Sequence, residues 1–423
     1  MVKFIEKRNK KIEDFSREKL SKSLEKAIYQ INVNKEILVD YIEDLDLNIV
    51  KSSDLNKLLI KKAVSLTNID DFENLKWRFV ASRIVLETYI KLACINRNNP
   101  KSSRYVNDYY EFLQMAVENN VYDKTILEEY SKKEIENFRK ELKEEYDFGF
   151  DYAGMNILTN RYLVKLNGKE FEKPQEMFLS ISLLLALPEK KENRIQIAKE
   201  FYHAIASRKI SLATPILLNL RKPNGNLASC FIGAMDDDLD SIYYTLDQLA
   251  QISKNAGGCG VNISRIRCAG SYIKNVKGAS SGVMPWVKLI NDTGIAVNQQ
   301  GARAGAITVA LDIWHYDIEE FLHCQTENGD HRKKAFDIFP QIVIPDLFMK
   351  RVEENKDWTL LDPYEVRKKY NIELAELYGK EFEEKYTFLE LEELEFKKVV
   401  KAKELFKMFF KNCCRNRNAL CLF

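Results

Sequence analysis

Two neighbouring stretches of the sequence carry hydroxyl groups in positions that could bind phosphate. SLATPILLN at 211–219 places Thr214 at the end of a predicted strand, and NLASCFIG at 226–233 places Ser229 and Cys230 at the start of another. Hydroxyl groups at strand ends of α/β folds are good phosphate donors. The thiol of Cys230 is, by residue type alone, more often a small apolar residue of the core.

Two glycine-rich stretches could approach a ligand closely. NAGGCGVNIS at 255–264 lacks the context of a dinucleotide fingerprint, because its glycines end a helix and lead into a strand. A helix cap with a tight turn is the favoured interpretation. NQQGARAGAIT at 298–308 offers Gln299, Gln300 and Arg303 beside small residues, which suits a ligand-binding loop, although a surface turn fits the same residues.

The numbers of charged residues and cysteines restrict which partners and sites the chain can have. The 65 Lys and Arg residues almost balance the 63 Asp and Glu residues, which argues against nucleic-acid or membrane partners and favours small molecules or proteins. Eight cysteines at irregular spacing and an N-terminus without an apolar core predict a reducing, cytoplasmic location. The trio His323, Cys324 and His331 lacks zinc-ligand spacing, so no metal site is predicted.

The elements that must position these residues change character along the chain. Residues 1–95 predict a short basic hairpin followed by helices, with Ser16 as a helix N-cap, and residues 105–208 are again helical by period. After 208, β-like runs alternate with helix-length segments, which predicts an α/β layer or barrel. A helix is predicted over 238–256, with one face made of Leu239, Ile242, Tyr243, Leu246, Leu249 and Ala250.

Taken in order, these pieces resemble the large subunit of class I ribonucleotide reductase. The resemblance covers residues 1 to about 411 and rests on KRNKKIEDFSREKL, SLATP, NLASCFIGAMDDDLDSI, GGCGVNISRIRCAGS, QQGARAGA, WHYDIEEFL and KAKELFKMFF. It implies an ATP-cone overall-activity domain at 1–95, a helical domain at 105–208, and the first half of a ten-stranded α/β barrel with a specificity-effector site at 209–413. The implied fold class is therefore α/β with a helical N-terminal part.

The resemblance also implies roles for individual residues. In the cone, the basic hairpin and the first turn of the Ser16-capped helix would hold ATP or dATP, and a helical docking domain with a basic lip is the alternative. Its expected contacts are Lys7, Arg8, Glu13, Ser16, Lys19, Ser52, Asn56 and Lys91. Asp237 would meet the ribose of a deoxynucleotide effector, and Arg267 and Lys274 its phosphates. Two arginines, at 265 and 267, are expected to alternate on a strand, so that only one faces the ligand.

Substrate contacts follow from the same resemblance. Gln299, Gln300 and Arg303 would relay the identity of the effector to the substrate. Thr214 and Ser229 would hold the substrate diphosphate, and Cys230 would be one half of the dithiol that supplies two electrons to the ribose, with its partner beyond residue 423. The family's Asn-x-Cys-x-Glu motif is not matched by NALCLF, in which Asn418 and Cys421 are three positions apart and no glutamate follows.

The last ten residues are expected to be an out-of-frame tail. Codons that write CRNRNALCLF can, one base later, write VETGMPYVF, which is similar to the ETG-x-PY segment that the family has after KAKELFKMFF. Residues 414–423, with Cys414 and Cys421, would then have no evolved role. A split gene is the alternative explanation.

The resemblance implies an N-terminal portion of a ribonucleoside-diphosphate reductase that is inactive as a single chain. Its expected ligands are ATP or dATP and deoxynucleotide effectors, and its expected partners are a metal-containing, radical-generating small subunit and thioredoxin or glutaredoxin. A homodimer through the 238–256 helix and a separate C-terminal polypeptide are further expectations. A stand-alone nucleotide-binding regulatory module without catalysis is the alternative.

Overall fold

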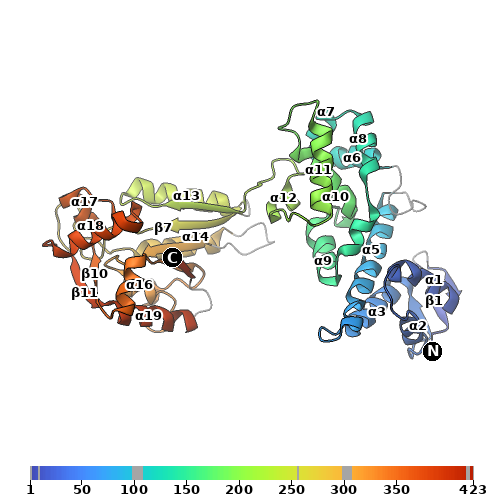
Figure 1. The fold of residues 1–423 in the computed structure, drawn as a ribbon, viewed down its shortest axis with the longest axis horizontal. Coiled ribbons are helices and arrows are strands. Elements are labelled where there is room, and N and C mark those ends of the chain that lie inside the picture. Colours follow the sequence, from blue (N-terminus) through green and yellow to red (C-terminus); the bar gives the residue numbers. More distant parts are fainter. Residues whose placement is uncertain are drawn as a thin grey trace. The chain divides into compact units, whose positions relative to one another are not determined.

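The computed structural model describes residues 2–7, 10–97, 108–254, 257–297, 307–415 and 420–422, and for 412–415 and 420–422 it describes the backbone alone. The chain forms two compact units, Met1–Leu227 and Ala228–Phe423 (Figure 1). The hydrophobic core of the second unit is separate from the cores of the first. Within the described residues, no helix combines the length and apolar character that a membrane span needs.

The first unit begins with a small mixed sheet packed against helices. Strands β1 (Phe4–Glu6) and β2 (Ile12–Asp14) form the predicted antiparallel hairpin, and β3 (Ile49–Lys51) pairs parallel to β1. The helices are α1 (Arg17–Ile28), α2 (Glu36–Glu43), α3 (Ser52–Ser65), α4 (Phe72–Leu75) and α5 (Trp77–Asn96). Leu20, Leu24 and Ala27 of α1 are buried, because they share one helical face.

Helix α5 contributes to two cores. Trp77 and Val80 near its start pack into the N-terminal core, and Leu86 and Ile90 pack into the core of the helices that follow. Those helices are α6 (Tyr109–Glu118), α7 (Thr125–Glu129), α8 (Lys132–Phe138), α9 (Tyr152–Ile157), α10 (Pro174–Leu185), α11 (Arg194–Ala206) and α12 (Thr214–Asn219), with a small hairpin of β4 (Lys165–Leu166) and β5 (Lys169–Glu170). The two predicted N-terminal regions therefore lie in one compact unit and share a helix.

The strand predicted at 211–219 is wrong. Thr214 is the first residue of helix α12, and Pro215 lies in its first turn, where a missing N–H breaks no helical hydrogen bond. The buried Arg221, which follows α12, contacts Glu172 of the same unit, with Nε 2.8 Å from Oε1. The boundary between units accordingly lies at Leu227, later than the boundary expected at 208.

The second unit is built on a parallel sheet. Its strands are β6 (Cys230–Ala234), β7 (Gly258–Asn262), β8 (Ile307–Asp312), β9 (Phe339–Val343) and β12 (Leu420–Leu422), in the order β12-β9-β8-β7-β6. A separate antiparallel pair consists of β10 (Asp357–Leu361) and β11 (Lys397–Lys401). The helices are α13 (Leu239–Lys254), α14 (Met284–Ala296), α15 (Ile318–Leu322), α16 (Asp346–Glu353), α17 (Pro363–Tyr370), α18 (Gly379–Leu391) and α19 (Ala402–Arg415).

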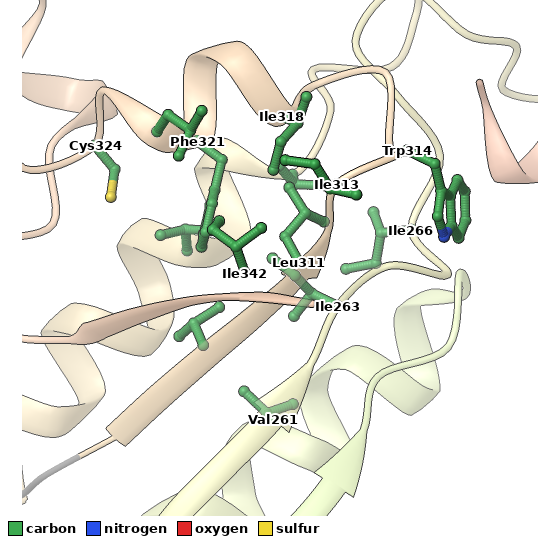
Figure 2. Packing of buried hydrophobic residues seen from close by; sticks show 14 of the residues in the cluster. Val261, Ile263, Ile266, Leu311, Ile313, Trp314, Ile318, Phe321, Cys324 and Ile342 are labelled. Carbon is green, nitrogen blue, oxygen red and sulfur yellow. The ribbon is translucent and has the colours of Figure 1, made fainter. Parts of the chain in front are cut away.

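Buried β-branched and aliphatic residues hold this sheet to its helices. Figure 2 shows Ile263, Leu311 and Ile342 converging from neighbouring segments, and each of these side chains is at most 2% exposed. The β-like runs predicted after residue 208 include the strands at 230, 258, 307 and 339. Among these four strands, β8 is mostly buried, as is typical of a central parallel strand, whereas β7 and β9 alternate in burial and β6 is largely exposed. The closed ten-stranded barrel stays a prediction. Strand β12 lies in the segment predicted to be an out-of-frame tail, which also stays a prediction.

Candidate functional site

A hollow in the first unit gathers the predicted cone residues. Its volume is about 560 Å³, and the hairpin, the start of α1, the start of α3 and the end of α5 line it. Every expected cone contact that the structure describes is among the lining residues, namely Lys7, Glu13, Ser16, Lys19, Ser52, Asn56 and Lys91. Arg8 lies outside the described residues. Residues from four separate segments, far apart in the sequence, thus share one pocket.

The charges in this hollow suit an anionic ligand. Glu13 contacts Lys7 at 3.3 Å and Lys19 at 3.9 Å, and these side chains are at least two-fifths exposed, so the pairs are weak. Lys91 has no carboxylate within 4.0 Å among the described residues. Ser16 accepts a hydrogen bond from the amide of Lys19, which confirms the predicted N-cap and points the start of α1 into the hollow. A phosphate group here would meet lysines and a helix N-terminus.

In the second unit, an ion-pair cluster lies beyond the carboxyl ends of β6 and β7. Asp237 follows β6, and Arg267 lies in the segment after β7. Asp237 accepts hydrogen bonds from the Arg267 amide at 3.0 Å and from Arg267 Nε at 2.9 and 3.0 Å. The Asp237 side chain is 9% exposed. Burial raises the pKa of its carboxyl, and the bonds from Arg267 and the charge of Arg367 oppose that rise.

Sequence reasoning missed Arg367 of α17 as a member of this cluster. Its Nη2 donates to Asp237 Oδ2 at 3.0 Å, although the two residues are 130 positions apart in the chain. Tyr364 of the same helix lies with its ring 4.3 Å from the guanidinium of Arg267. The stretch DPYEVRKK shows a helix start and basic residues, but nothing in that pattern indicates that Arg367 faces Asp237.

The remaining predicted effector residues are not brought into this cluster by any described contact. Lys274 is exposed at a turn, where Lys274 and Asn275 have left-handed φ values of 47° and 65°. The expected strand with alternating arginines is wrong, because Arg265 lies in a turn after β7 and Arg267 in the irregular segment that follows. On a strand, moreover, two residues two positions apart would share a face. Arg265 instead pairs with Asp236 at 2.5 Å. The predicted relay residues Gln299, Gln300 and Arg303 lie outside the described residues.

Cys230 is exposed at the first position of β6, so the interpretation of this cysteine as a buried core residue is wrong. Its Sγ lies 3.6 Å from the hydroxyl oxygen of the exposed Ser229. Thr214 belongs to the first unit, where its hydroxyl shares a 3.1 Å hydrogen bond with Tyr162. An accessible thiol can carry thiol–disulfide chemistry, which a buried one cannot.

Comparison with known proteins gives a consistent family. A family model described as ribonucleotide reductase, all-alpha domain, matches residues 148–225, and one described as ribonucleotide reductase, barrel domain, matches residues 228–423. The ribonucleoside-diphosphate reductase subunit alpha of Synechocystis sp. is 48% identical over 338 residues, 79% of this chain and 43% of that protein. The chain belongs to the ribonucleotide reductase large-subunit family.

Other members of this reductase family match over a similar range. The subunit alpha of Helicobacter pylori is 38% identical over 367 residues, which is 86% of this chain and 44% of that protein. The large subunit of Arabidopsis thaliana is 32% identical over 393 residues, 87% of this chain and 45% of that protein. The chain thus spans somewhat less than half the length of these reductase subunits.

The reductase domain matches agree with the structural division. The all-alpha match ends at residue 225 and the barrel match begins at 228, on either side of the boundary at Leu227. The fold is mixed α/β with a helical N-terminal part, as the sequence predicts. No group of His, Cys, Asp or Glu side chains suited to a metal ion occurs in the ranges of the reductase chain that the structure describes.

Proposed function

We propose that this chain acts within a ribonucleoside-diphosphate reductase large subunit, in which ribonucleotides are reduced to deoxyribonucleotides under allosteric control by nucleotides. The observation that supports this function most is that the exposed thiol of Cys230 opens the first strand of the segment similar to the reductase barrel. We also propose that the protein is located in the cytoplasm and binds neither nucleic acid nor membranes.

In this proposal Cys230 is one thiol of the reducing dithiol. The pair gives two electrons to the ribose and becomes a disulfide, and thioredoxin or glutaredoxin reduces it again. Thr214 and Ser229 hold the substrate diphosphate through their hydroxyl groups. A small subunit that contains a metal supplies the radical, and the radical cysteine and the second thiol belong to residues outside this chain, on the same or a separate polypeptide.

The hollow at the start of α1 is the proposed ATP or dATP site. Its lysines and the N-terminus of α1 support this assignment, because both attract phosphate. Asp237, Arg267 and Lys274 form the proposed specificity-effector site, supported by its position beyond the carboxyl ends of parallel strands, where α/β sheets bind ligands. Gln299, Gln300 and Arg303 would link this effector to the substrate.

A symmetric homodimer through 238–256 is proposed as well. On α13 the predicted apolar face divides in two: Ile242, Leu246 and Leu249 are buried, whereas Leu239 is 62% and Tyr243 is 56% exposed. Tyr244 is a further 67% exposed. An exposed apolar stripe on a well-packed helix supports a second copy as its cover.

The test is nucleotide binding together with reconstituted turnover. Purified chain is titrated with ATP and with dTTP, and CDP reduction is then measured with a small subunit, thioredoxin and a polypeptide that covers the rest of the family length. Binding of both nucleotides with restored CDP reduction supports the proposal. Binding without restored turnover supports the regulatory module instead, and turnover by this chain with only a small subunit and thioredoxin contradicts the assignment of the second thiol.

A further inference from the structure

Each nitrogen of the Arg267 guanidinium has a hydrogen-bond partner in this structure. Its Nε bonds to both carboxylate oxygens of Asp237, its Nη2 donates to the Asp237 carbonyl at 3.3 Å, and its Nη1 donates to the Tyr272 carbonyl at 2.5 Å. An arginine has five N–H donors, and these bonds occupy each of its three nitrogens. Asp237 therefore occupies the edge of the guanidinium formed by Nε and Nη2, and Arg267 must give up these bonds before the same edge can form a bidentate pair with the phosphate of an effector.

Release of Arg267 would leave Asp237 in a costly environment. The carboxylate side chain is 9% exposed, and a charge so far removed from water is stable only if it is paired or hydrogen-bonded. Arg267 supplies most of its bonds in this structure. Without a second cation, the gain from a new arginine–phosphate pair would be offset by an unpaired buried carboxylate.

Helix α17 supplies that second cation in a fixed position. Arg367 Nη2 lies 3.0 Å from Asp237 Oδ2, while its Nη1 donates to the Arg265 carbonyl at 2.9 Å and to Glu373 at 3.0 Å. These bonds hold Arg367 independently of Arg267. Asp237 is thus shared between two arginines that come from different segments of the chain.

The start of α17 is fixed to the segment that carries Arg267. Asp362, the N-cap of α17, accepts hydrogen bonds from the Cys268 amide at 2.9 Å and from the Ser271 hydroxyl at 2.6 Å. Tyr364 covers the Arg267 guanidinium at 4.3 Å. The helix therefore contacts this segment at several points, so that Arg367 keeps its place while the long side chain of Arg267 moves.

We infer that Arg367 is a positioning residue of the effector site, which keeps the Asp237 carboxylate paired and oriented toward the ribose when Arg267 turns from Asp237 to the effector phosphates. This inference rests on the proposed effector role of Asp237 and Arg267. It assigns Arg367 and α17 a part in nucleotide recognition by means of an exchange of ion pairs.

The experiment measures dTTP affinity of the whole chain by calorimetric titration. Arg367→Gln is expected to weaken dTTP binding about tenfold, or about 1.4 kcal/mol, because the buried Asp237 carboxylate loses a charged partner. Arg367→Lys should restore most of the affinity, since it returns the positive charge. Lys368→Gln is the matched control: it removes one positive charge from an exposed position of the same helix and should leave the affinity within about twofold.

A double-mutant cycle separates positioning from a general loss of structure. In an Asp237→Asn background there is no carboxylate to keep paired, so adding Arg367→Gln should change dTTP affinity by less than about twofold. An equal tenfold loss in both backgrounds would overturn the inference, and so would wild-type affinity in Arg367→Gln; the proposed effector site would survive either result. If the unaltered chain binds no dTTP, the effector site itself is wrong and the inference falls with it.

Discussion

The buried ion pair between Glu172 and Arg221 gives the sharpest stability prediction. Both side chains are 0% exposed, and Arg221 Nη2 lies 3.0 Å from Glu172 Oε2. Glu172 also accepts hydrogen bonds from the Tyr122 hydroxyl and from the Val164 amide at 2.7 Å. Burial raises the pKa of Glu172, and the charge of Arg221 opposes that rise. The first unit thus encloses two opposite charges that compensate each other.

The perturbation is Glu172→Gln, which leaves the Arg221 guanidinium buried without a counter-charge. Such a change costs about 3–5 kcal/mol, or roughly 6–20 °C in the midpoint of thermal unfolding for a unit of this size. The midpoint is followed by circular dichroism and by differential scanning calorimetry of the whole chain. Glu128→Gln, which removes an exposed carboxylate that pairs with Lys124, is the control and should shift the midpoint by about 1–2 °C at most.

The double variant Glu172→Gln with Arg221→Met tests the cause of the effect. Removal of the second charge should recover a large part of the loss, because replacement of both partners of a buried pair by uncharged groups is far less costly than removal of one. If the single variant unfolds within 2 °C of the wild type, or if the double variant is less stable than the single one by a similar further amount, the reasoning about uncompensated burial is wrong.

Three further predictions concern other elements. Leu311→Ala in the central strand β8 should lower the free energy of unfolding by about 2–5 kcal/mol in urea titrations, since its side chain is 0% exposed. Ser16→Ala should cost about 0.5–2 kcal/mol and speed amide exchange at the start of α1, because the Lys19 amide loses its cap. The pair with Lys199 lowers the pKa of Glu141 below its ordinary value of 4.5. The ionised Glu141 therefore stabilises the fold above pH 4.5, and this stabilisation is lost as pH falls through the lowered pKa. In urea unfolding from neutral pH to about pH 3, the stability of the wild type should converge with that of Glu141→Gln.

Local patterns predicted the local elements well. Charged residues, capping residues and apolar runs, each confined to a short stretch of sequence, indicated the hairpin at 4–15, the Ser16 cap and the strands from 230, 258, 307 and 339. The strand at 211–219 failed because the pattern of apolar residues does not distinguish a short helix from a strand. Pro215 was the available signal, since proline is common in the first turn of a helix.

Contacts between segments that are distant in the chain could not be predicted from the sequence. Arg367 reaches Asp237 only because α17 lies along the turn after β7, and no periodicity within either segment encodes that arrangement. Likewise, Cys230 is exposed because it lies on β6, the largely exposed edge strand of the sheet, while its residue type favoured burial. The grouping of the cone residues was expected from a family resemblance, and the common hollow agrees with that expectation without testing what it binds.

Helix α5 limits how this protein can be engineered. A helix of 20 residues is about 30 Å long, and this one anchors the N-terminal module at one end and the neighbouring bundle at the other. A graft of this N-terminal module onto another protein would therefore have to include all of α5, because a cut in the middle of the helix removes apolar side chains from both cores. Because α5 is one continuous helix, a small tilt at its first turn would also move its far end by a larger distance.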